Sequence, residues 1–168
     1  MRIIAMFILL SLTGCGYHAP ASSDHWVGGD ARNLYIDLFV NQTSEPYLEN
    51  YMTDAMVAEL SRSRLVKLTE NPELAEVFLA GEVKDFTSTA LAYGSTDRIT
   101  DYRATMTIAA RLVRKGNSEI LWQGNLTRNE DYLATVNKNL QLEGERLAAR
   151  QAAQRLAEDI YASLLNGF

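Results

Sequence analysis

The sequence predicts an α+β fold: a two-layer sandwich in which two helices cover one face of a four-stranded mixed sheet, in the order β-α-β-β-β-α. Two observations predict it. Four segments carry apolar residues at every second position, which is the period of a strand with one buried face. Two others carry apolar residues at helical spacing. Because the strands alternate so strictly, we expect both helices on the same face of the sheet.

The first strand and helix are expected in the segment 34–64. The strand occupies residues 34–40, with an inward set of Leu34, Ile36, Leu38 and Val40. Pro46 suits the first turn of the helix, because its missing N–H has no partner there in any case. The helix ends near Arg64, and its apolar stripe is Leu48, Met52, Ala55, Met56 and Leu60. Residues 65–69 are ambiguous, and Pro72 breaks the chain.

Three strands and a second helix are expected in the remainder. The strands occupy residues 77–86, 102–112 and 119–127, and Lys115–Ser118 forms a hairpin turn between the last two. The last strand turns Ile120, Trp122 and Leu126 inward. The helix spans residues 139–165, and its inward stripe is Leu142, Ala149, Ala153, Leu156, Ile160 and Leu164. The outer face of the sheet is mixed, so it either binds a partner or is solvated; it holds Tyr35, Phe39, Phe78, Lys84, Thr105, Thr107 and Arg111.

The N-terminus has the pattern of a lipoprotein export signal. Arg2 precedes an apolar run at residues 3–12, which is shorter than the about 20 residues that a membrane-spanning helix needs. The motif Leu12-Thr13-Gly14-Cys15 follows. We therefore expect residues 1–14 to be a removed signal peptide and Cys15 to carry the lipid, followed by a flexible tether over 15–33 and one domain over 34–168. Since Gly16 rather than Asp follows the cysteine, the expected address is the periplasmic face of the outer membrane.

No pattern of catalytic or metal-binding residues is found. His18 and His25 lie in the expected tether, where neither is held for acid–base work. Cys15 is the only cysteine, and no metal or cofactor motif occurs. Asp97 and Asp101 are interpreted as a solvated loop pair. A net charge of −5 disfavours nucleic acid as a partner. We therefore expect a binding or scaffold protein without a cofactor, rather than an enzyme.

Several motifs, in their order along the chain, resemble the LptE family of lipopolysaccharide (LPS)-assembly lipoproteins. They are C-G-Y-H at 15–18, F-V-N-Q-T-S-E-P-Y-L-E at 39–49, A-E-V-F-L-A-G-E-V at 75–83, D-Y-R at 101–103 and I-L-W at 120–122. The resemblance implies a plug inside the β-barrel of the LPS transporter LptD, which helps that barrel assemble and binds LPS in transit. The fold that it implies agrees with the periodicity.

The expected topology places a group of cations at one end of the sheet. If the first two long strands run parallel, the loops 41–47, 93–100 and 128–139 lie at the same end. This end would bring together Arg98, Arg103, Arg128 and Lys138. Arg and Lys make charge-assisted hydrogen bonds to phosphates, which lipid A carries. The alternative is that these are ordinary solvated charges, balanced by Asp97, Asp101, Glu130 and Asp131. Arg98 and Lys138 lie nearest the positions where the resemblance places lipid-contacting charges.

An F-x-N-x-T strand end, as at residues 39–43, also occurs in two other kinds of envelope lipoprotein. An activator of a peptidoglycan synthase must reach through the periplasm, whereas residues 16–33 extend at most roughly 60 Å. A curli-type secretion channel needs membrane-spanning hairpins, and no segment remains to supply them. The activator is the alternative to an LPS-assembly role.

Overall fold

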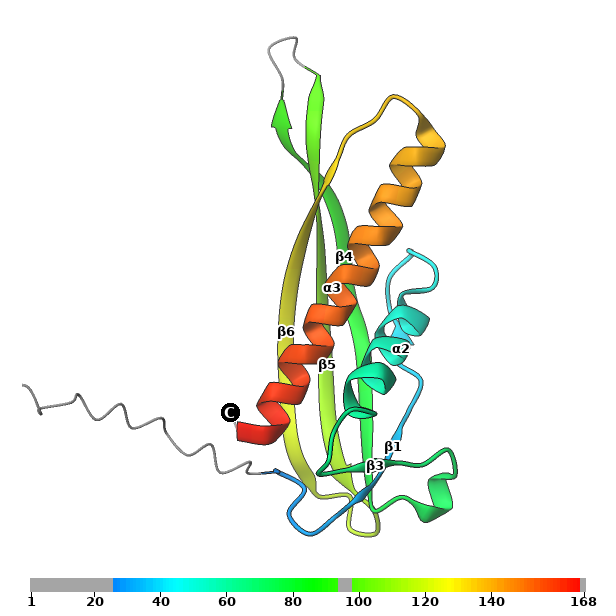
Figure 1. Ribbon diagram of the computed structural model, residues 1–168, viewed down its shortest axis with the longest axis vertical. Coiled ribbons are helices and arrows are strands. Elements are labelled where there is room, and N and C mark those ends of the chain that lie inside the picture. The colour runs from blue at the N-terminus through cyan, green and yellow to red at the C-terminus, as the bar shows by residue number, and fades with distance from the viewer. Residues whose placement is uncertain (1–25, 94–97, 167–168) are drawn as a thin grey trace, which may run out of the picture.

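A mixed sheet and two helices make up the part of the chain that the computed structural model describes, residues 26–93 and 98–166 (Figure 1). The elements are β1 (Asn33–Ile36), β2 (Val40–Asn41), α2 (Leu48–Leu60), β3 (Lys67–Leu68), a 3-10 turn η2 (Pro72–Leu74), β4 (Val77–Tyr93), β5 (Ile99–Arg114), β6 (Ile120–Leu133) and α3 (Lys138–Asn166). The α+β prediction is confirmed, but the sheet has six strands rather than four. The first predicted strand is split in two, and the ambiguous segment 65–69 contributes β3.

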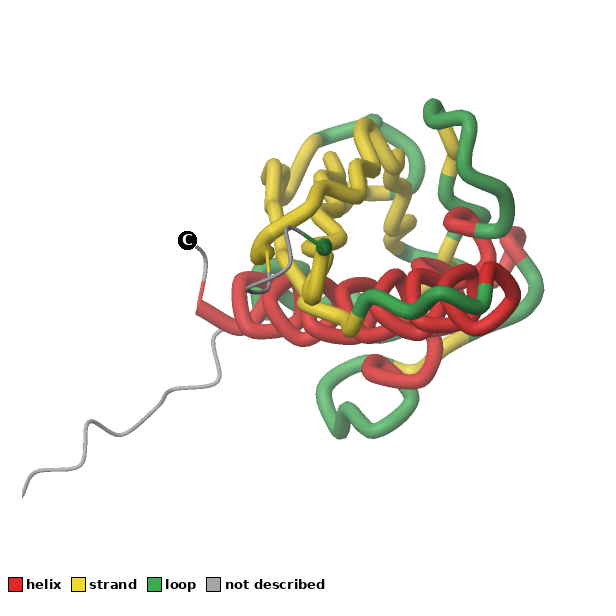
Figure 2. The backbone as a smooth tube through the Cα atoms, turned by 90° about the horizontal axis from the view of Figure 1, so that it is seen from above, coloured by secondary structure: helices red, strands yellow, loops and turns green. Residues whose placement is uncertain are grey.

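The sheet has the order β3-β1-β4-β5-β6, with β2 also pairing with β4. β1 runs parallel to β4, and β5 runs antiparallel to both β4 and β6. Both helices lie on the same side of the long strands (Figure 2). At about 3.3 Å per residue, the 17 residues of β4 span about 55 Å. β1 and β2 pair only with its first part, up to Val83.

The domain therefore has two unlike ends. The near end holds residues 26–33, η2, the 115–118 turn and the C-terminus of α3. The far end holds the second half of β4, the strand ends that pair with it, residues 134–137 and the first turns of α3. Figure 1 shows the near end at the bottom and the far end at the top.

One extra residue interrupts the first predicted strand. Ile36 pairs with Leu79, whereas Val40 pairs with Glu82, so a four-residue step on one strand matches a three-residue step on the other. Such a bulge reverses the alternation of side chains beyond it. The period-2 pattern of 34–40 therefore holds only for its first part.

Phe39 is buried as a result, while Leu38 and Val40 are 62% and 55% exposed. The prediction that Leu38 and Val40 face the core, with Phe39 on the outer face, was wrong. The Phe39 ring lies against Gly81, where an added Cβ would come within 2.1 Å of the ring. Gly81 thus makes room for the aromatic ring between the sheet and α2.

The predicted buried stripe of α2 is confirmed residue by residue, but the helix is shorter than predicted, since it begins at Leu48, after Pro46, and ends at Leu60. The buried positions are Leu48, Met52, Ala55, Met56 and Leu60. The loop before the helix is fixed by the Asn41 side chain, which donates to the Glu45 carbonyl at 2.7 Å and accepts from the Thr43 amide at 3.0 Å. Local polar bonds of this kind set the direction from which α2 starts.

α3 packs on β5, β6 and α2 through alanines, as expected from its sequence. The buried alanines are 148, 149, 152, 153 and 157, and Leu156, Ile160 and Leu164 continue the buried stripe towards the C-terminus. Leu142, predicted to face inward, is 43% exposed. The helix begins at the far end, beyond the part of the sheet that α2 helps to cover, so its first turns have little core to pack on.

The 115–118 turn forms as predicted, with Gly116 at φ 99. A bulge beside Leu112 moves Ile120 out of the inward set, and Ile120 is 53% exposed, whereas Trp122 is buried.

The chain is already folded at Trp26, before the expected start of the domain at residue 34. Trp26 is 5% exposed and its indole N–H donates to the Ala31 carbonyl at 2.9 Å. The Val27 amide donates to the Leu164 carbonyl, which joins the start of the domain to the end of α3. Cys15, His18, His25 and the expected signal peptide lie outside the described residues.

Candidate functional site

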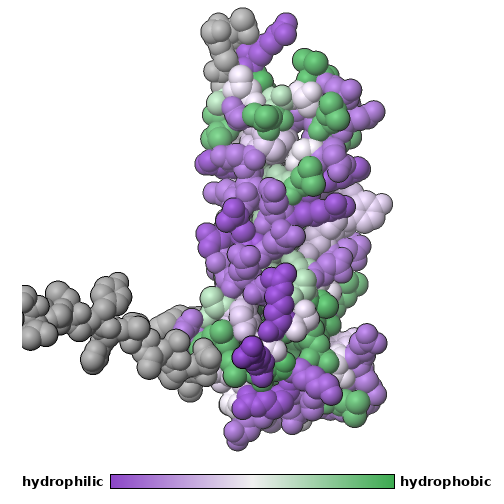
Figure 3. All heavy atoms as spheres, in the orientation of Figure 1, coloured by the Kyte–Doolittle hydropathy of each residue, from purple (hydrophilic) through white to green (hydrophobic). Residues whose placement is uncertain are grey.

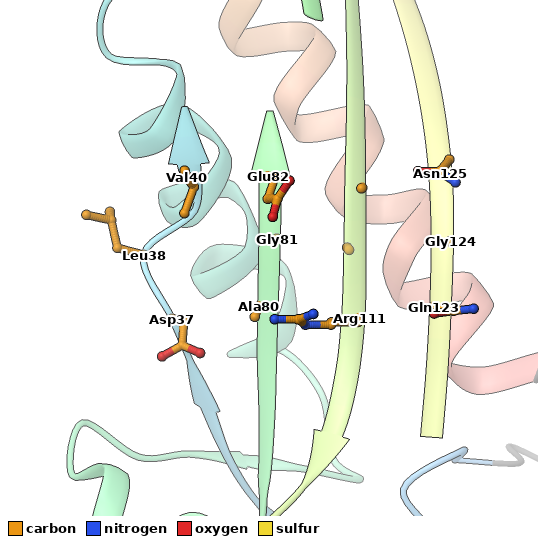
Figure 4. Close-up of a pocket in the computed structure, with 12 residues that line it drawn as sticks. Asp37, Leu38, Val40, Ala80, Gly81, Glu82, Arg111, Gln123, Gly124 and Asn125 are labelled. Atoms are coloured by element: carbon orange, nitrogen blue, oxygen red, sulfur yellow. The ribbon is translucent and has the colours of Figure 1, made fainter. Parts of the chain in front are cut away.

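The face of the sheet opposite the helices holds an open groove of about 830 Å³ (Figure 4). β4 and β5 supply a floor of small residues, including Ala80, Gly81 and Ala109. Longer side chains stand around it, from Asp37, Leu38, Val40, Glu82, Arg111, Gln123 and Asn125. The bulge between β1 and β2 is the reason that Leu38 and Val40 belong to this groove rather than to the core. A small floor lets another surface come close to the strands.

Charges of both signs line this groove. Burial raises the pKa of the Asp37 carboxyl, and the Arg111 guanidinium opposes that rise. Figure 4 shows the Arg111 side chain lying over β4 toward Asp37. The Glu82 carboxylate accepts from Gln42 at 2.8 Å and pairs with Lys84 at 3.0 Å. The groove is therefore a polar contact surface, with an apolar rim at Leu38 and Val40.

Arg98, Arg103 and Lys138 lie towards the far end, as predicted. Arg128 does not join them, because it lies near the middle of β6, opposite Met106, and binds Asp159, 21 residues after Lys138 on α3.

The four cations are also in two different states. Arg98 precedes β5 and Lys138 begins α3; both are exposed and take part in none of the ion pairs found among the described residues. The segments before β5 and before α3 lie side by side, because the Ala134 amide donates to the Thr100 carbonyl at 2.8 Å. These two cations are available to a ligand.

Arg103 and Arg128 are instead held by carboxylates of the same chain. Arg103 donates to both oxygens of Asp131, at 2.7 and 2.9 Å, and this pair raises the pKa of Arg103 and lowers that of Asp131. Arg128 donates to both oxygens of Asp159 on α3. Asp131 was among the neighbours expected to balance these charges, whereas Asp159 is distant in sequence and could not be anticipated.

The predicted clustering of three loops holds for two of them. Among the described residues, 98–100 and 134–137 lie together at the far end, and residues 128–133 belong to β6. The loop 41–47 does not reach it, because the Gln42 amide bonds to the Val83 carbonyl and β4 continues beyond that point to Tyr93. The difference arises from the length of β4, which the sequence pattern underestimated.

Sequence reasoning missed a set of exposed apolar residues at the far end. They are Leu91, Leu133, Val136 and Leu140, whose exposed fractions are 45%, 76%, 97% and 62%. Leu133 and Val136 fall between the predicted strand 119–127 and the predicted helix 139–165. Leu and Val in a stretch with neither strand nor helix periodicity could have indicated exposed apolar residues.

Among residues 26–93 and 98–166, no group of His, Cys, Asp and Glu is arranged to hold a metal ion. Within the same residues, no helix combines the length and the apolar character that crossing a membrane requires.

Comparison with known proteins gives a family and a shared fold. A family model described as "LptE: Lipopolysaccharide-assembly" matches residues 31–164. Curated protein sequences give no match.

Solved structures resemble the chain at low identity. A putative lipoprotein from Caulobacter crescentus has 15% identity and a TM-score of 0.59, covering 83% of this chain and 93% of that one. Rare lipoprotein B from Shewanella oneidensis has 14% identity and a TM-score of 0.55, covering 81% and 96%. The PelC dodecamer of Paraburkholderia phytofirmans has 14% identity and a TM-score of 0.56, covering 82% and 89%. At these identities the likeness shows the fold alone.

The family model covers most of the chain, including both helices and all the long strands, and it supports a role in LPS assembly. This chain therefore belongs to the LptE family of lipopolysaccharide-assembly proteins.

Proposed function

We propose that this chain is an outer-membrane lipoprotein that plugs an LptD-like β-barrel, helps that barrel to assemble, and contacts LPS with its far end. Family membership supports the LPS-assembly role. The observation that carries the plug is the long sheet face with no helix on it. No catalytic residue is proposed.

The uncovered face suits the inside of a barrel. Along the middle of β5 and β6 its residues are small or polar, as in the Thr107 and Thr127 hydroxyls, which lie 3.0 Å apart. The lumen of a membrane barrel is polar, so the surface of a plug should be hydrophilic rather than hydrophobic. A plug that contacts the wall along such strands buries more than about 2,000 Å², the range of obligate interfaces.

The anchor is proposed at Cys15. Only ten residues separate Cys15 from Trp26, where the fold begins, and they span at most about 40 Å. The near end of the domain would therefore stay close to the membrane that holds the lipid. Cys15→Ala is expected to abolish incorporation of labelled palmitate, and unchanged labelling would contradict the assignment.

Co-purification tests the barrel partner. Thr107→Trp places a bulky side chain on the open face, and Gln154→Trp places the same side chain on the exposed side of α3 as the control. We expect Thr107→Trp to lower the amount of barrel that co-purifies and to make cells leaky to large antibiotics, with Gln154→Trp near wild type. Recovery of a peptidoglycan synthase instead of a barrel would favour the activator function.

The LPS contact is proposed at the two cations that form no ion pair among the described residues. Arg98 and Lys138 would bind the phosphates of lipid A, with Arg103 further along β5. We expect Arg98→Asp with Lys138→Asp to weaken LPS binding while barrel association and the fold persist. The matched control is Arg64→Asp with Lys67→Asp, the same charge change at exposed positions outside the far end. LPS binding equal to wild type in the far-end variant would exclude this site.

A further inference from the structure

β6 forms a long open edge of the sheet. Among residues 26–93 and 98–166 it pairs only with β5, so one side of its 14 residues has no neighbouring strand (Figure 1). Such an edge is a template on which another chain can add a strand, and proteins usually protect it with Lys, Pro or a bulge. β6 contains neither Lys nor Pro, and its pairing with β5 has no bulge from Trp122 to Leu133.

The other open edge of the sheet is protected. Beyond Val83, β4 has no neighbour on its outer side within the described residues. Lys84 and Asp85 stand at the start of that stretch, and three register shifts interrupt its pairing with β5. Charges and bulges of this kind hinder the addition of a strand. The two edges of the same sheet therefore differ, and only β6 is suited to pairing.

β6 also lacks charges that would oppose a neighbouring strand. Residues 120–127 carry no charge. The three charged residues that follow are each bound by another residue of this chain, two of them by α3, and Figure 3 shows hydrophilic side chains gathered over α3 at mid-height. The ion pairs are Arg128–Asp159, Glu130–Arg155 and Asp131–Arg103.

The bonds to β5 determine which backbone groups of β6 point outward. The Ala134 amide donates to the Thr100 carbonyl, and the same register continues without a shift from Leu133 to Trp122. Because bonded and non-bonded residue pairs alternate between antiparallel strands, even-numbered residues of β6 bond to β5, and odd-numbered residues point their N–H and C=O groups outward. The exposed outward residues of this stretch include Gln123, Asn125, Thr127 and Asn129.

A strand added to β6 would meet one apolar and one polar side. Trp122 is buried and Leu126 half-buried on the side of the helices. The outward residues place uncharged amide and hydroxyl side chains on the opposite, open face. In strand addition, main-chain hydrogen bonds supply affinity and alternate side chains supply specificity. The edge therefore fits an extended segment whose side chains alternate between apolar and uncharged polar.

We propose that β6 accepts a strand from the barrel partner, supplied by an extended, uncharged segment outside the barrel wall. The inference rests on the plug function proposed above. Strands of a closed wall are paired on both sides, so they have no free edge to offer. The contact would be continuous with the plug surface, since Gln123 and Asn125 also line the groove. Two copies of this chain joined only through residues 120–127 would contribute 8 residues a side, against about 20–30 in a stable interface.

Amide hydrogen exchange of the wild-type chain, alone and in the purified complex with the barrel, tests the pairing directly. We expect the amides of Asn125, Thr127 and Asn129 to exchange quickly in the free chain and about a hundredfold more slowly in the complex, because each gains a hydrogen bond. The control is the protected edge, where the same alternation across β5 points the amides of Phe86 and Ser88 outward. Burial inside the barrel without strand pairing should slow these amides by less than about tenfold.

A proline substitution tests the same hydrogen bonds. Asn125→Pro removes one outward N–H, and an edge strand tolerates proline where that N–H faces solvent. Asn125→Ala is the matched control, because it removes the same side chain and keeps the N–H. We expect Asn125→Pro to bind the barrel about tenfold more weakly and Asn125→Ala to match wild type. Thermal unfolding of both variants checks that the fold persists.

Equal slowing of exchange at both edges in the complex would overturn the inference, since it would then reflect burial alone. Equal barrel binding by Asn125→Pro and Asn125→Ala, with both folded, would also overturn it. Slow exchange along β6 in the free chain, together with a dimeric mass, would assign the edge to a second copy instead. If the wild-type chain bound no barrel, the plug function itself would fail and the inference with it.

Discussion

The two halves of the molecule use the same three strands for different purposes. In the near half, the sheet is covered by α2 and α3, and the fully buried side chains are large and apolar, such as Leu34, Met56 and Leu156. In the far half, β4 to β6 continue without β1, β2 or α2. There the helix-facing side carries Tyr102 stacked on Tyr132 at 5.5 Å, and Tyr132 bonds to Ser88 at 2.6 Å.

The difference indicates where stability and binding reside. Burial of apolar area is the main favourable contribution to folding, and most of it lies in the near half. The far half adds long strands, one aromatic stack and ion pairs, and leaves its apolar and cationic side chains exposed. The near half is therefore expected to determine whether the chain folds, and the far half what it binds.

Truncating a large side chain in each half gives the largest contrast. Phe39→Ala removes a ring that is 1% exposed and leaves a cavity beside Gly81, so we expect a loss of about 3–5 kcal/mol in unfolding free energy. Leu133→Ala removes a side chain that is 76% exposed, and we expect a change within about 0.5 kcal/mol. Urea unfolding measures both. Similar losses would show that the far half has a core of its own.

Substitution of one glycine in each half tests the same difference in packing, with a smaller expected effect on stability. Gly81→Ala places a methyl group against the buried Phe39 ring, and overpacking of this kind is expected to destabilise by about 1–3 kcal/mol. Gly144→Ala, in the far half of α3, brings the methyl group to 3.2 Å from Tyr132. Alanine favours a helix over glycine by about 1 kcal/mol, which offsets that contact, so we expect a change close to zero. A large loss at Gly144 would mean that Tyr132 is as rigidly packed as Phe39.

The near half was also the more predictable half. The stripe of α2, from Leu48 to Leu60, and the alanines of α3 followed from helical spacing, because amphipathic periods are local in sequence. The bulge before Phe39 could not be predicted, since it depends on the register against Leu79 and Glu82 in a distant strand. A single inserted residue places Leu38 and Val40 on the exposed face of the sheet instead of the core face.

The candidate site was predictable in residue type but not in pairing. Topology predicted Arg98, Arg103, Arg128 and Lys138 at one end of the sheet, but Arg128 lies near the middle of β6. Which of them are free depended on carboxylates contributed by other elements, above all Asp159 of α3. Val136 was overlooked because an exposed apolar residue in a loop has no periodic signal.

The pH dependence of stability tests the role of Glu145, which lies on α3 between the two halves. Burial raises the pKa of Glu145 on α3, and the nearby Glu45 raises it further. A raised pKa in the folded chain means that ionised Glu145 opposes folding at neutral pH, and that this cost disappears as pH falls below its ordinary pKa of 4.5. We expect Glu145→Gln to stabilise the protein modestly at pH 7 and to have little effect near pH 4. Thermal unfolding at both pH values measures this, with Glu158→Gln, on the exposed side of the same helix, as the control. An equal gain at both pH values would contradict the electrostatic cause.

The smallest expected effect concerns Arg103, a cation of the far half that is paired with a carboxylate. Arg103 is engaged by Asp131, and the lowered pKa of Asp131 keeps this pair intact throughout the neutral range, so mild acid would not release it. Asp131→Asn removes the carboxylate and frees a third cation on the same half as Arg98 and Lys138. Because the pair is exposed, the loss of stability should be small and should shrink further with added salt.

We therefore expect Asp131→Asn to bind deacylated LPS a few-fold more tightly than wild type at low salt. The matched control is Glu119→Gln, which frees Arg114 from an ion pair of 3.4 Å at the near end and should leave binding unchanged. A gain in both variants would reflect only the change in net charge. The near and far halves would then not differ in how their charges affect LPS binding. A gain in Asp131→Asn alone would place Arg103 within reach of the ligand phosphates and define the lower boundary of the site.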